Sequence, residues 1–455
     1  MAYDLLIKNG KVVLEDRVDD VEIAVRGGKI AAIGINLGDS QKTIDAEGMY
    51  VLPGVIDCHI HFCDPGRADW EGFETGTKAL AAGGTTCYMD MPLNNLPATT
   101  DGHALKLKLE AAKDTNYVDY TFYGGVAPYN LDKGQLKELD EGGVVGYKAF
   151  LSTCGFDVPG DFKNVNDYEL YEGMTQLAAL GQTILVHCEN ATICDNLGEK
   201  AIAKGKTDMY SYLDSRPVFS EVEAVKRALY LAKVTGCKVH FVHLSSAEVV
   251  QEALKARHEG MDVSIETCPH YLLLDRDQCK EIGPTAKCSP PIRSKEESER
   301  LWEELFDGNI DVIGSDHSPC PPYMKDTGGD IFKAWGGLSA CQNVLDMMFD
   351  AAVQKRGMCP TQLMKILATN AAKTFGIPNK GKIAPGMDAD LVLLKPNAPY
   401  RLEAEGLYYK HKHSAYVGKE IGCQIMQTLV RGNLVYDRTS GIVGRPIGQY
   451  VRKNK

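Results

Sequence analysis

The chain has 455 residues, 44% hydrophobic and 24% charged, which is typical of a folded globular protein with one large and one smaller domain. Its net charge of -11 argues against nucleic acid or an anionic membrane as a partner. We find no signal peptide and no apolar stretch of about 18 residues, and therefore expect a cytoplasmic protein without a membrane span.

The N-terminal segment reads as short strands separated by turns. Residues 4–14 contain Asn9-Gly10, which is typical of a tight hairpin, and residues 21–33 turn at Gly27-Gly28. The same pattern of short strand-like runs separated by turns occurs after residue 380, in residues 390–394 and in residues 427–436, which turn at Gly432-Asn433. We therefore expect residues 1–52 and 379–455 to meet as one small β-sandwich, because isolated strands are rarely stable.

The middle of the chain, residues 53–378, alternates strand-like and helix-like runs. Eight runs are apolar and strand-like: 55–61, 85–91, 119–126, 144–150, 183–187, 238–243, 262–267 and 310–315. A helical stripe between them is clearest in residues 222–232, through Val225 and Leu229. Eight such units predict an α/β fold of the (β/α)8 TIM-barrel type, in which functional residues lie at the C-terminal ends of the strands.

The first of these runs ends in His59-Ile60-His61. Side chains alternate between the faces of a strand, so both histidines point the same way and can bind one metal ion. Four later runs also end in potential ligands: Lys148, His187, His243 and Asp316. Nitrogen and oxygen ligands suit Zn, Mn, Co, Ni or Fe, so the sequence predicts a metal site on the barrel.

Lys148 has three possible states. It lies among apolar residues, where a bare ammonium group is costly. A buried ion pair, a side chain that extends to solvent, and carbamylation by CO2 to a metal-bridging carboxylate all remain open. Asp316 can bind metal and also move protons.

Several other residues resemble ligands without being good candidates. His240 lies three residues before His243, on the opposite face of the strand, and we interpret it as structural. The second His-x-His motif, at residues 411–413, follows no apolar strand and suggests a surface or an interface. The fourteen cysteines form no CxxC pair, and Cys58 and Cys188 beside the candidate ligands are most simply packing residues.

These residues, together with the segment at 381–392, resemble the amidohydrolase superfamily over essentially the whole chain. Within it they are similar to the cyclic amidohydrolases, which include dihydroorotases, hydantoinases and allantoinases. The resemblance implies a binuclear centre, with zinc the first choice, that has these ligands: His59, His61 and Asp316 on one metal, His187 and His243 on the other, and carbamylated Lys148 as the bridge.

The loops favour one branch of this group. Residues 64–77 and 89–99, and also 287–293 and 334–338, resemble the allantoinase versions of these segments. Hydantoinases usually carry a tyrosine after the lysine that contacts the tetrahedral intermediate, and residues 150–155 contain none. The resemblance therefore implies hydrolysis of the ring amide of allantoin to allantoate, in purine catabolism.

The resemblance also implies roles for individual residues and for partners. Asp316 is expected to act as the general base, and the backbone at Ser289 and Gly337 to hold the imide edge of the substrate. Arg67 either contacts the ureido tail or forms a loop salt bridge. The expected partners are a small-molecule substrate and further copies of the chain, as a homo-oligomer and specifically a tetramer.

Three alternatives stay open. The nearest is a hydantoinase or dihydropyrimidinase, and the next a dihydroorotase. A non-catalytic dihydropyrimidinase-like scaffold is more remote, because such scaffolds have lost metal ligands and all six positions are filled here. Dinucleotide binding finds no support, since no GxGxxG motif follows a strand.

Overall fold

A ring of parallel strands forms the middle of the chain in the computed structural model, which describes residues 2–132 and 134–453. The ring contains β6 (Val55–Ile60), β7 (Thr85–Asp90), β8 (Asp119–Phe122), β9 (Gly124–Gly125), β10 (Tyr147–Phe150), β11 (Thr183–His187), β12 (Lys238–Phe241), β13 (Val263–Thr267) and β14 (Val312–Ile313). β8 and β9 share one position, so the ring has the eight positions expected from the sequence. Most of these strands read as unbroken buried runs, because both faces of a barrel strand are covered.

The ring closes between its first and last strands. Parallel pairing runs from β6 to β8 and from β9 to β14. His317, just after β14, forms a parallel bridge with Ile60, and its carbonyl accepts a hydrogen bond of 2.9 Å from the backbone N–H of His61. Asp57 adds a side-chain tie, because its Oδ1 accepts from the backbone N–H of Ser315 at 3.0 Å. The ends of β6 and β14 are thereby held side by side.

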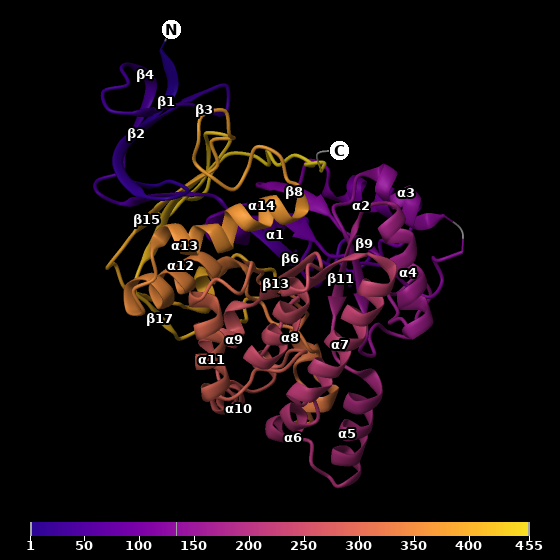
Figure 1. Cartoon of the computed structure of the whole chain (residues 1–455). Coiled ribbons are helices and arrows are strands. Elements are labelled where there is room, and N and C mark those ends of the chain that lie inside the picture. The colour runs from indigo at the N-terminus through magenta and orange to yellow at the C-terminus, as the bar shows by residue number, and fades with distance from the viewer. Residues whose placement is uncertain (1, 133, 454–455) are drawn as a thin grey trace.

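Helices follow the strands around the ring (Figure 1). They are α1 (Phe73–Ala82), α2 (Gly102–Ala112), α3 (Gln135–Gly142), α4 (Asp167–Ala179), α5 (Ala191–Ala203), α6 (Met209–Asp214), α7 (Val218–Thr235), α8 (Ala247–His258), α9 (Pro269–Leu273), α10 (Arg276–Ile282), α11 (Lys295–Phe306), α12 (Val344–Met348), α13 (Pro360–Met364) and α14 (Asn370–Phe375). Short 3-10 turns are η1 (Gly283–Ala286), η2 (Pro322–Met324), η3 (Ile331–Lys333), η4 (Cys341–Asn343) and η7 (Ala404–Gly406), and π-helical turns are η5 (Phe349–Lys355) and η6 (Lys365–Thr369). The helix expected at 222–232 lies within α7, with Val225 and Leu229 buried. In the described part of the chain, no helix has the length and apolar character that crossing a bilayer requires.

Both ends of the chain build a second unit around one nine-stranded sheet. Its strands are β1 (Tyr3–Val13), β2 (Val18–Arg26), β3 (Lys29–Gly34), β4 (Ser40–Asp45), β5 (Tyr50–Pro53), β15 (Leu391–Lys395), β18 (Gln424–Val430), β19 (Asn433–Asp437) and β20 (Gly441–Ile442), and β16 (Tyr400–Arg401) pairs separately with β17 (Glu420–Ile421). β15 pairs antiparallel with β5, so the indigo N-terminal and yellow C-terminal strands adjoin in Figure 1. The predicted meeting of the two ends is confirmed, whereas the exact limits at 52/53 and 378/379 stay a prediction.

The turn signals were only partly right. Gly27 and Gly28 do form the turn between β2 and β3, with φ of 58° and 76°. The hairpin expected at Asn9-Gly10 is wrong, because β1 continues through both residues and its pairing register shifts there. Asn9 has a left-handed φ of 58°, and a Cβ on Gly10 would lie 2.6 Å from Val51, so the pair forms a bulge that lets another strand approach closely.

A buried lysine ties the barrel to the terminal unit. The Lys380 ammonium lies 2.7 Å from Asp119 of β8, 3.0 Å from Asp388 and 2.7 Å from Asp390. Arg431 of the terminal sheet also pairs with Asp119. The three carboxylates are therefore neutralised by cations of the chain itself.

Candidate metal centre

A cavity of about 700 Å³ opens among loops that follow the barrel strands. It is lined by five of the six side chains that the sequence predicted as ligands: His59, His61, His187, His243 and Asp316. The sixth, Lys148, is fully buried in β10. All six lie at or just beyond the C-terminal ends of five strands, where a barrel places its functional groups.

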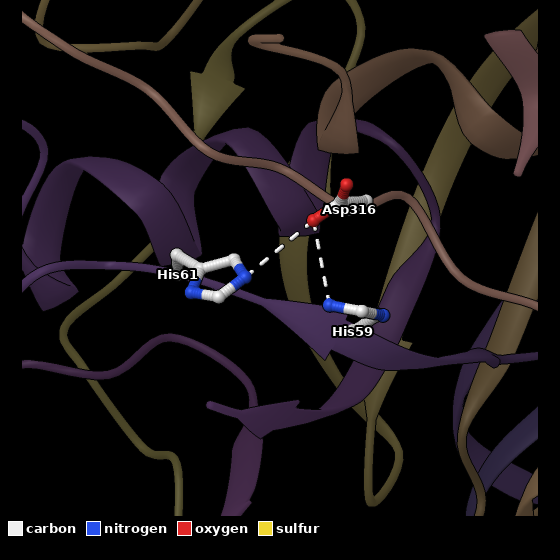
Figure 2. A group of neighbouring side chains, drawn as sticks. All are labelled: His59, His61 and Asp316. Atoms are coloured by element: carbon white, nitrogen blue, oxygen red, sulfur yellow. Dashed lines mark ion pairs between the residues drawn. The ribbon is translucent and has the colours of Figure 1, made fainter. Parts of the chain in front are cut away.

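His59, His61 and Asp316 form one compact group of three side chains (Figure 2). Oδ1 of Asp316 lies 3.4 Å from Nε2 of His59 and 3.4 Å from Nε2 of His61. The opposite nitrogen of each ring is held: Nδ1 of His59 contacts Glu266 at 2.6 Å, and Nδ1 of His61 donates to the Leu93 carbonyl at 2.8 Å. Each ring therefore directs the lone pair of Nε2 toward Asp316, as a metal ligand requires.

His187 and His243 form a second pair on the neighbouring strands. Nδ1 of His187 lies 3.0 Å from Nε2 of His243, and the rings meet edge to face at a centroid distance of 4.6 Å. Nε2 of His187 contacts the Glu189 carboxylate at 2.9 Å, which leaves Nδ1 as its acceptor nitrogen. The His59 and His243 rings are 5.3 Å apart, so the second pair adjoins the first group.

Burial keeps these groups in the protonation states that metal binding needs. Desolvation lowers the pKa of His59, His187 and His243, with the charge of Lys148 adding to the effect on His59 and His243. Burial alone would raise the pKa of Asp316, but the neighbouring His61, His270 and Lys148 outweigh burial and lower the pKa. His59, His187 and His243 are therefore neutral and the Asp316 carboxylate is ionised near neutral pH.

Lys148 lies on the strand next to His187 without a hydrogen-bond partner for its Nζ among the described residues. Its side chain is fully buried, and Nζ lies 5.1 Å from the Phe150 ring centroid. Desolvation lowers its pKa to about 8. This burial disagrees with a solvent-directed side chain, and no ion pair of Lys148 is found among the described residues; carbamylation stays a prediction.

The backbone is also unusual at two of these residues. His243 has a φ of 40° and Asp316 a φ of 46°, although neither is glycine. Left-handed backbone costs a non-glycine residue about 1–2 kcal/mol, and such positions gather at functional sites. Both residues lie in the first turn after a strand, so the strained turns direct their side chains into the cavity.

The donor set fits divalent metal ions. Besides Nζ of Lys148, the buried Nε2 of His59 and Nδ1 of His243 have no hydrogen-bond partner among the described residues. Buried polar atoms are nearly always satisfied, so unpaired imidazole nitrogens beside a carboxylate indicate a missing ligand. Imidazole and carboxylate groups are the donors that catalytic divalent metals use.

The three predicted substrate residues lie in different surroundings. Ser289 lines the cavity, and its Oγ lies 2.6 Å from the Tyr212 hydroxyl. Gly337 follows Gly336, which lines the cavity, and its carbonyl accepts from Lys325 Nζ at 2.8 Å. Arg67 is not among the lining residues.

Arg67 instead forms the loop salt bridge that was its other interpretation. Its guanidinium lies 2.8 Å from the Asp161 carboxylate and donates to the Asn94 carbonyl at 2.7 Å. It also packs against Trp70 and Phe156, at 5.3 and 5.1 Å from their ring centroids. These contacts join loops beside the cavity, and a substrate contact by Arg67 stays a prediction.

The residues set aside in the sequence lie apart from the candidate ligands. His240 does not line the cavity, and its ring contacts Ser264 at 2.8 Å and Glu266 at 3.0 Å. His411 and His413 donate to the carbonyls of Asp69 and Cys320. Cys58 and Cys188 are buried and form no disulfide, in agreement with a packing role, and the Cys58 thiol also donates to Glu266 at 3.5 Å.

Sequence reasoning missed the carboxylates behind the histidines. Glu266 at the end of β13 contacts His59, and Glu189 contacts both His187 and Arg216, the latter at 2.6 Å. Arg216 lines the cavity. A carboxylate inside an apolar strand, as in residues 262–267, was the signal that could have identified Glu266.

Comparison with known proteins places the chain in a family. The model of the amidohydrolase family matches residues 50–435. The chain is 53% identical to the allantoinases of Salmonella newport and Salmonella typhimurium, over the full length of both sequences. The L-hydantoinase (dihydropyrimidinase) of Arthrobacter aurescens shares 36% identity with a TM-score of 0.95, over 99% of this chain and 100% of that one. The dihydropyrimidinase of Brevibacillus agri shares 31% identity with a TM-score of 0.91, over 98% of each chain.

The chain belongs to the amidohydrolase family. The predicted (β/α)8 barrel with a small β-sandwich is the fold of its structural relatives and is confirmed. Within the family it is a hydrolase of cyclic amides of the allantoinase type, as the loop segments predicted. Family and donor set together indicate a divalent metal centre and a small-molecule substrate.

Proposed function

We propose that this protein hydrolyses the ring amide of allantoin to give allantoate. The observation that carries the proposal is the convergence of four histidines and Asp316 on one cavity, in a chain 53% identical to allantoinases over its whole length. Water adds across the amide: its oxygen bonds to the ring carbonyl carbon, the C–N bond breaks, and a proton moves to the departing nitrogen.

The proposed metal ligands divide into two sets that share Lys148. His59, His61 and Asp316 would hold one divalent ion, and His187 and His243 a second. Lys148 would bridge them as a carbamate, because its buried Nζ has no hydrogen-bond partner in the described part of the chain and the added carboxylate supplies oxygen ligands. When bound, such ions lower the pKa of water and polarise the carbonyl group.

Asp316 is the proposed general base. The contacts of its carboxylate with His59, His61 and Ser318 all involve Oδ1. Oδ2 can therefore take the proton of the attacking water and deliver it to the ring nitrogen as the C–N bond breaks. The lowered pKa of Asp316 keeps it ionised and ready to accept that proton.

The cavity wall would orient the ring. Tyr212 donates to the Cys288 carbonyl at 2.9 Å and contacts Ser289, which fixes the segment whose backbone we assign to the imide edge. Lys325 holds the carbonyls of Trp335 and Gly337, both at 2.8 Å, and so fixes the adjacent segment. A ring bound against these two segments would lie in the cavity that the candidate ligands line.

Finer properties are also proposals. Zinc is the first choice of metal, ahead of Mn, Co, Ni or Fe, and the active form is a homotetramer in the cytoplasm. Hydrolysis of hydantoins or dihydropyrimidines is a second candidate function, favoured by the TM-score of 0.95 to an L-hydantoinase. The lack of a tyrosine in residues 150–155 argues for allantoin instead.

Metal removal and replacement test the proposed function. Protein treated with a chelator should lose allantoin hydrolysis, and zinc with bicarbonate should restore it. Allantoate formation is followed by chromatography, with metal content measured on the same samples. Full activity in protein shown to be free of metal would refute the metal-dependent reaction.

A further inference from the structure

We propose that Glu266 is a positioning residue shared by both halves of the metal centre, an inference that rests on the metal ligands proposed above. Glu266 is the penultimate residue of β13 and is fully buried. It does not line the cavity, so it acts through other residues rather than on the substrate.

One oxygen of Glu266 reaches both ligand sets. Oε1 lies 2.6 Å from Nδ1 of His59 and accepts from the backbone N–H of His243 at 3.1 Å. His59 lies on β6 and His243 just after β12, at separate positions of the ring. A single carboxylate oxygen therefore fixes a ring of the first set and the main chain of the second.

The other oxygen is held by groups that do not line the cavity. Oε2 contacts Nε2 of His240 at 3.0 Å and accepts from the Cys58 thiol at 3.5 Å. Ser264 contacts the other ring nitrogen of His240, Nδ1, at 2.8 Å. This contact fixes the His240 ring, which in turn fixes the carboxyl group of Glu266. A carboxyl group in this interior is tolerated because its contacts are with groups that can donate hydrogen bonds.

The barrel is also shaped to admit this carboxylate. A Cβ on Gly314, just after β14, would lie 2.7 Å from the Cβ of His59 and 3.2 Å from the Glu266 carboxyl group. Only glycine leaves room for these three strands to converge. The contact between Glu266 and His59 therefore depends on the packing of the ring itself.

Two consequences follow for metal binding. The carboxylate fixes His59 with its proton on Nδ1, which presents Nε2 to a metal and increases its basicity. The hydrogen bond to the His243 N–H stabilises the left-handed turn, with φ of 40°, that directs this side chain to the cavity. Loss of Glu266 should thus lower the metal affinity of both ligand sets.

Glu189 provides a matched comparison. Its carboxylate is also fully buried and contacts one candidate ligand, His187, at 2.9 Å. No hydrogen bond in the described structure joins Glu189 to His59, His61 or Asp316. Replacing Glu189 should therefore lower the metal affinity of the second set, His187 and His243, and leave that of the first set unchanged.

The test compares Glu266→Gln and Glu189→Gln with the unchanged full-length protein. Zinc binding is titrated in a competing-chelator buffer, the visible spectrum of the cobalt form is recorded, and the melting temperature of each apo-protein is measured. We expect Glu266→Gln to lose about 10–100-fold in affinity for both metals, with altered cobalt bands. Glu189→Gln should lose affinity for one metal only.

Three results would overturn the proposal. These are unchanged affinity in folded Glu266→Gln, loss of only one metal, or a lower apo melting temperature without a change in affinity, which marks a merely structural role. If Glu266→Gln does not fold, His240→Asn is used instead, because it removes the contact that holds Oε2 of Glu266. This variant should lower the affinity for both metal ions, and unchanged affinity for both would overturn the proposal. Failure of the unchanged protein to bind metal would refute the proposed function as well, so the two failures are distinguishable.

Discussion

Replacement of Asp316 by asparagine separates proton transfer from metal binding. Asparagine keeps the size of the side chain and an oxygen that can accept from the Ser318 hydroxyl at 3.1 Å, so we expect the fold to persist. It removes the basic carboxylate, and loss of a positioned general base lowers a rate about 10²–10⁴-fold. At about 1.4 kcal/mol per tenfold, the barrier should rise by about 3–5 kcal/mol.

The assay measures kcat for allantoin at saturating zinc, expressed per metal-loaded active site. Loss of the negative charge should also weaken the metal bound by His59 and His61, which is why metal content has to be measured on each sample. Asp195→Asn is the control, since this carboxylate lies at the cavity wall and accepts from the Thr153 hydroxyl. Near-normal kcat in metal-loaded Asp316→Asn would refute the general-base assignment.

Three further changes test other parts of the molecule. Lys148→Ala should lose metal, and short carboxylic acids should partly restore both metal and activity; unchanged metal content would contradict the bridging role. Gly337→Ala should raise KM, because its Cβ would lie 2.4 Å from a backbone carbonyl, whereas Gly406→Ala, with open space around it, should not. Lys380→Met should lower the free energy of unfolding in urea by about 3–5 kcal/mol, since it removes the buried cation shared by three carboxylates and leaves the buried Asp390 without a charged partner. The surface control Lys382→Met should cost at most about 1 kcal/mol, and equal losses would contradict the tie between barrel and sandwich.

The candidate ligands were readable from the sequence because of how a barrel is built. Each parallel strand delivers its C-terminal end to the same rim, so residues as distant as His59 and Asp316 had to converge once the strands were recognised. The joining of the two terminal segments in one sheet followed similarly from their shared strand pattern. Both inferences rested on the spacing of apolar residues along the chain and on the direction of the strands.

Contacts between residues that are distant in the sequence and meet only in the folded structure could not be predicted from the sequence. Glu266 looked like an ordinary strand residue, and only the convergence of β6, β12 and β13 shows which groups it reaches. Arg67 pairs with Asp161, 94 residues away, so its sequence neighbours gave no indication of the ion pair. Asn9-Gly10 was read as a hairpin because local turn chemistry does not reveal a neighbouring strand that stabilises a bulge.

Substrate preference tests the central claim most directly. Turnover of racemic allantoin should be compared with that of hydantoin, dihydrouracil and dihydroorotate, using protein reconstituted with zinc and bicarbonate. We expect kcat/KM for allantoin to exceed the values for the other three, with allantoate as the product. A preference for hydantoin or dihydrouracil would leave the barrel and its metal centre intact but contradict the assignment of allantoin as the substrate.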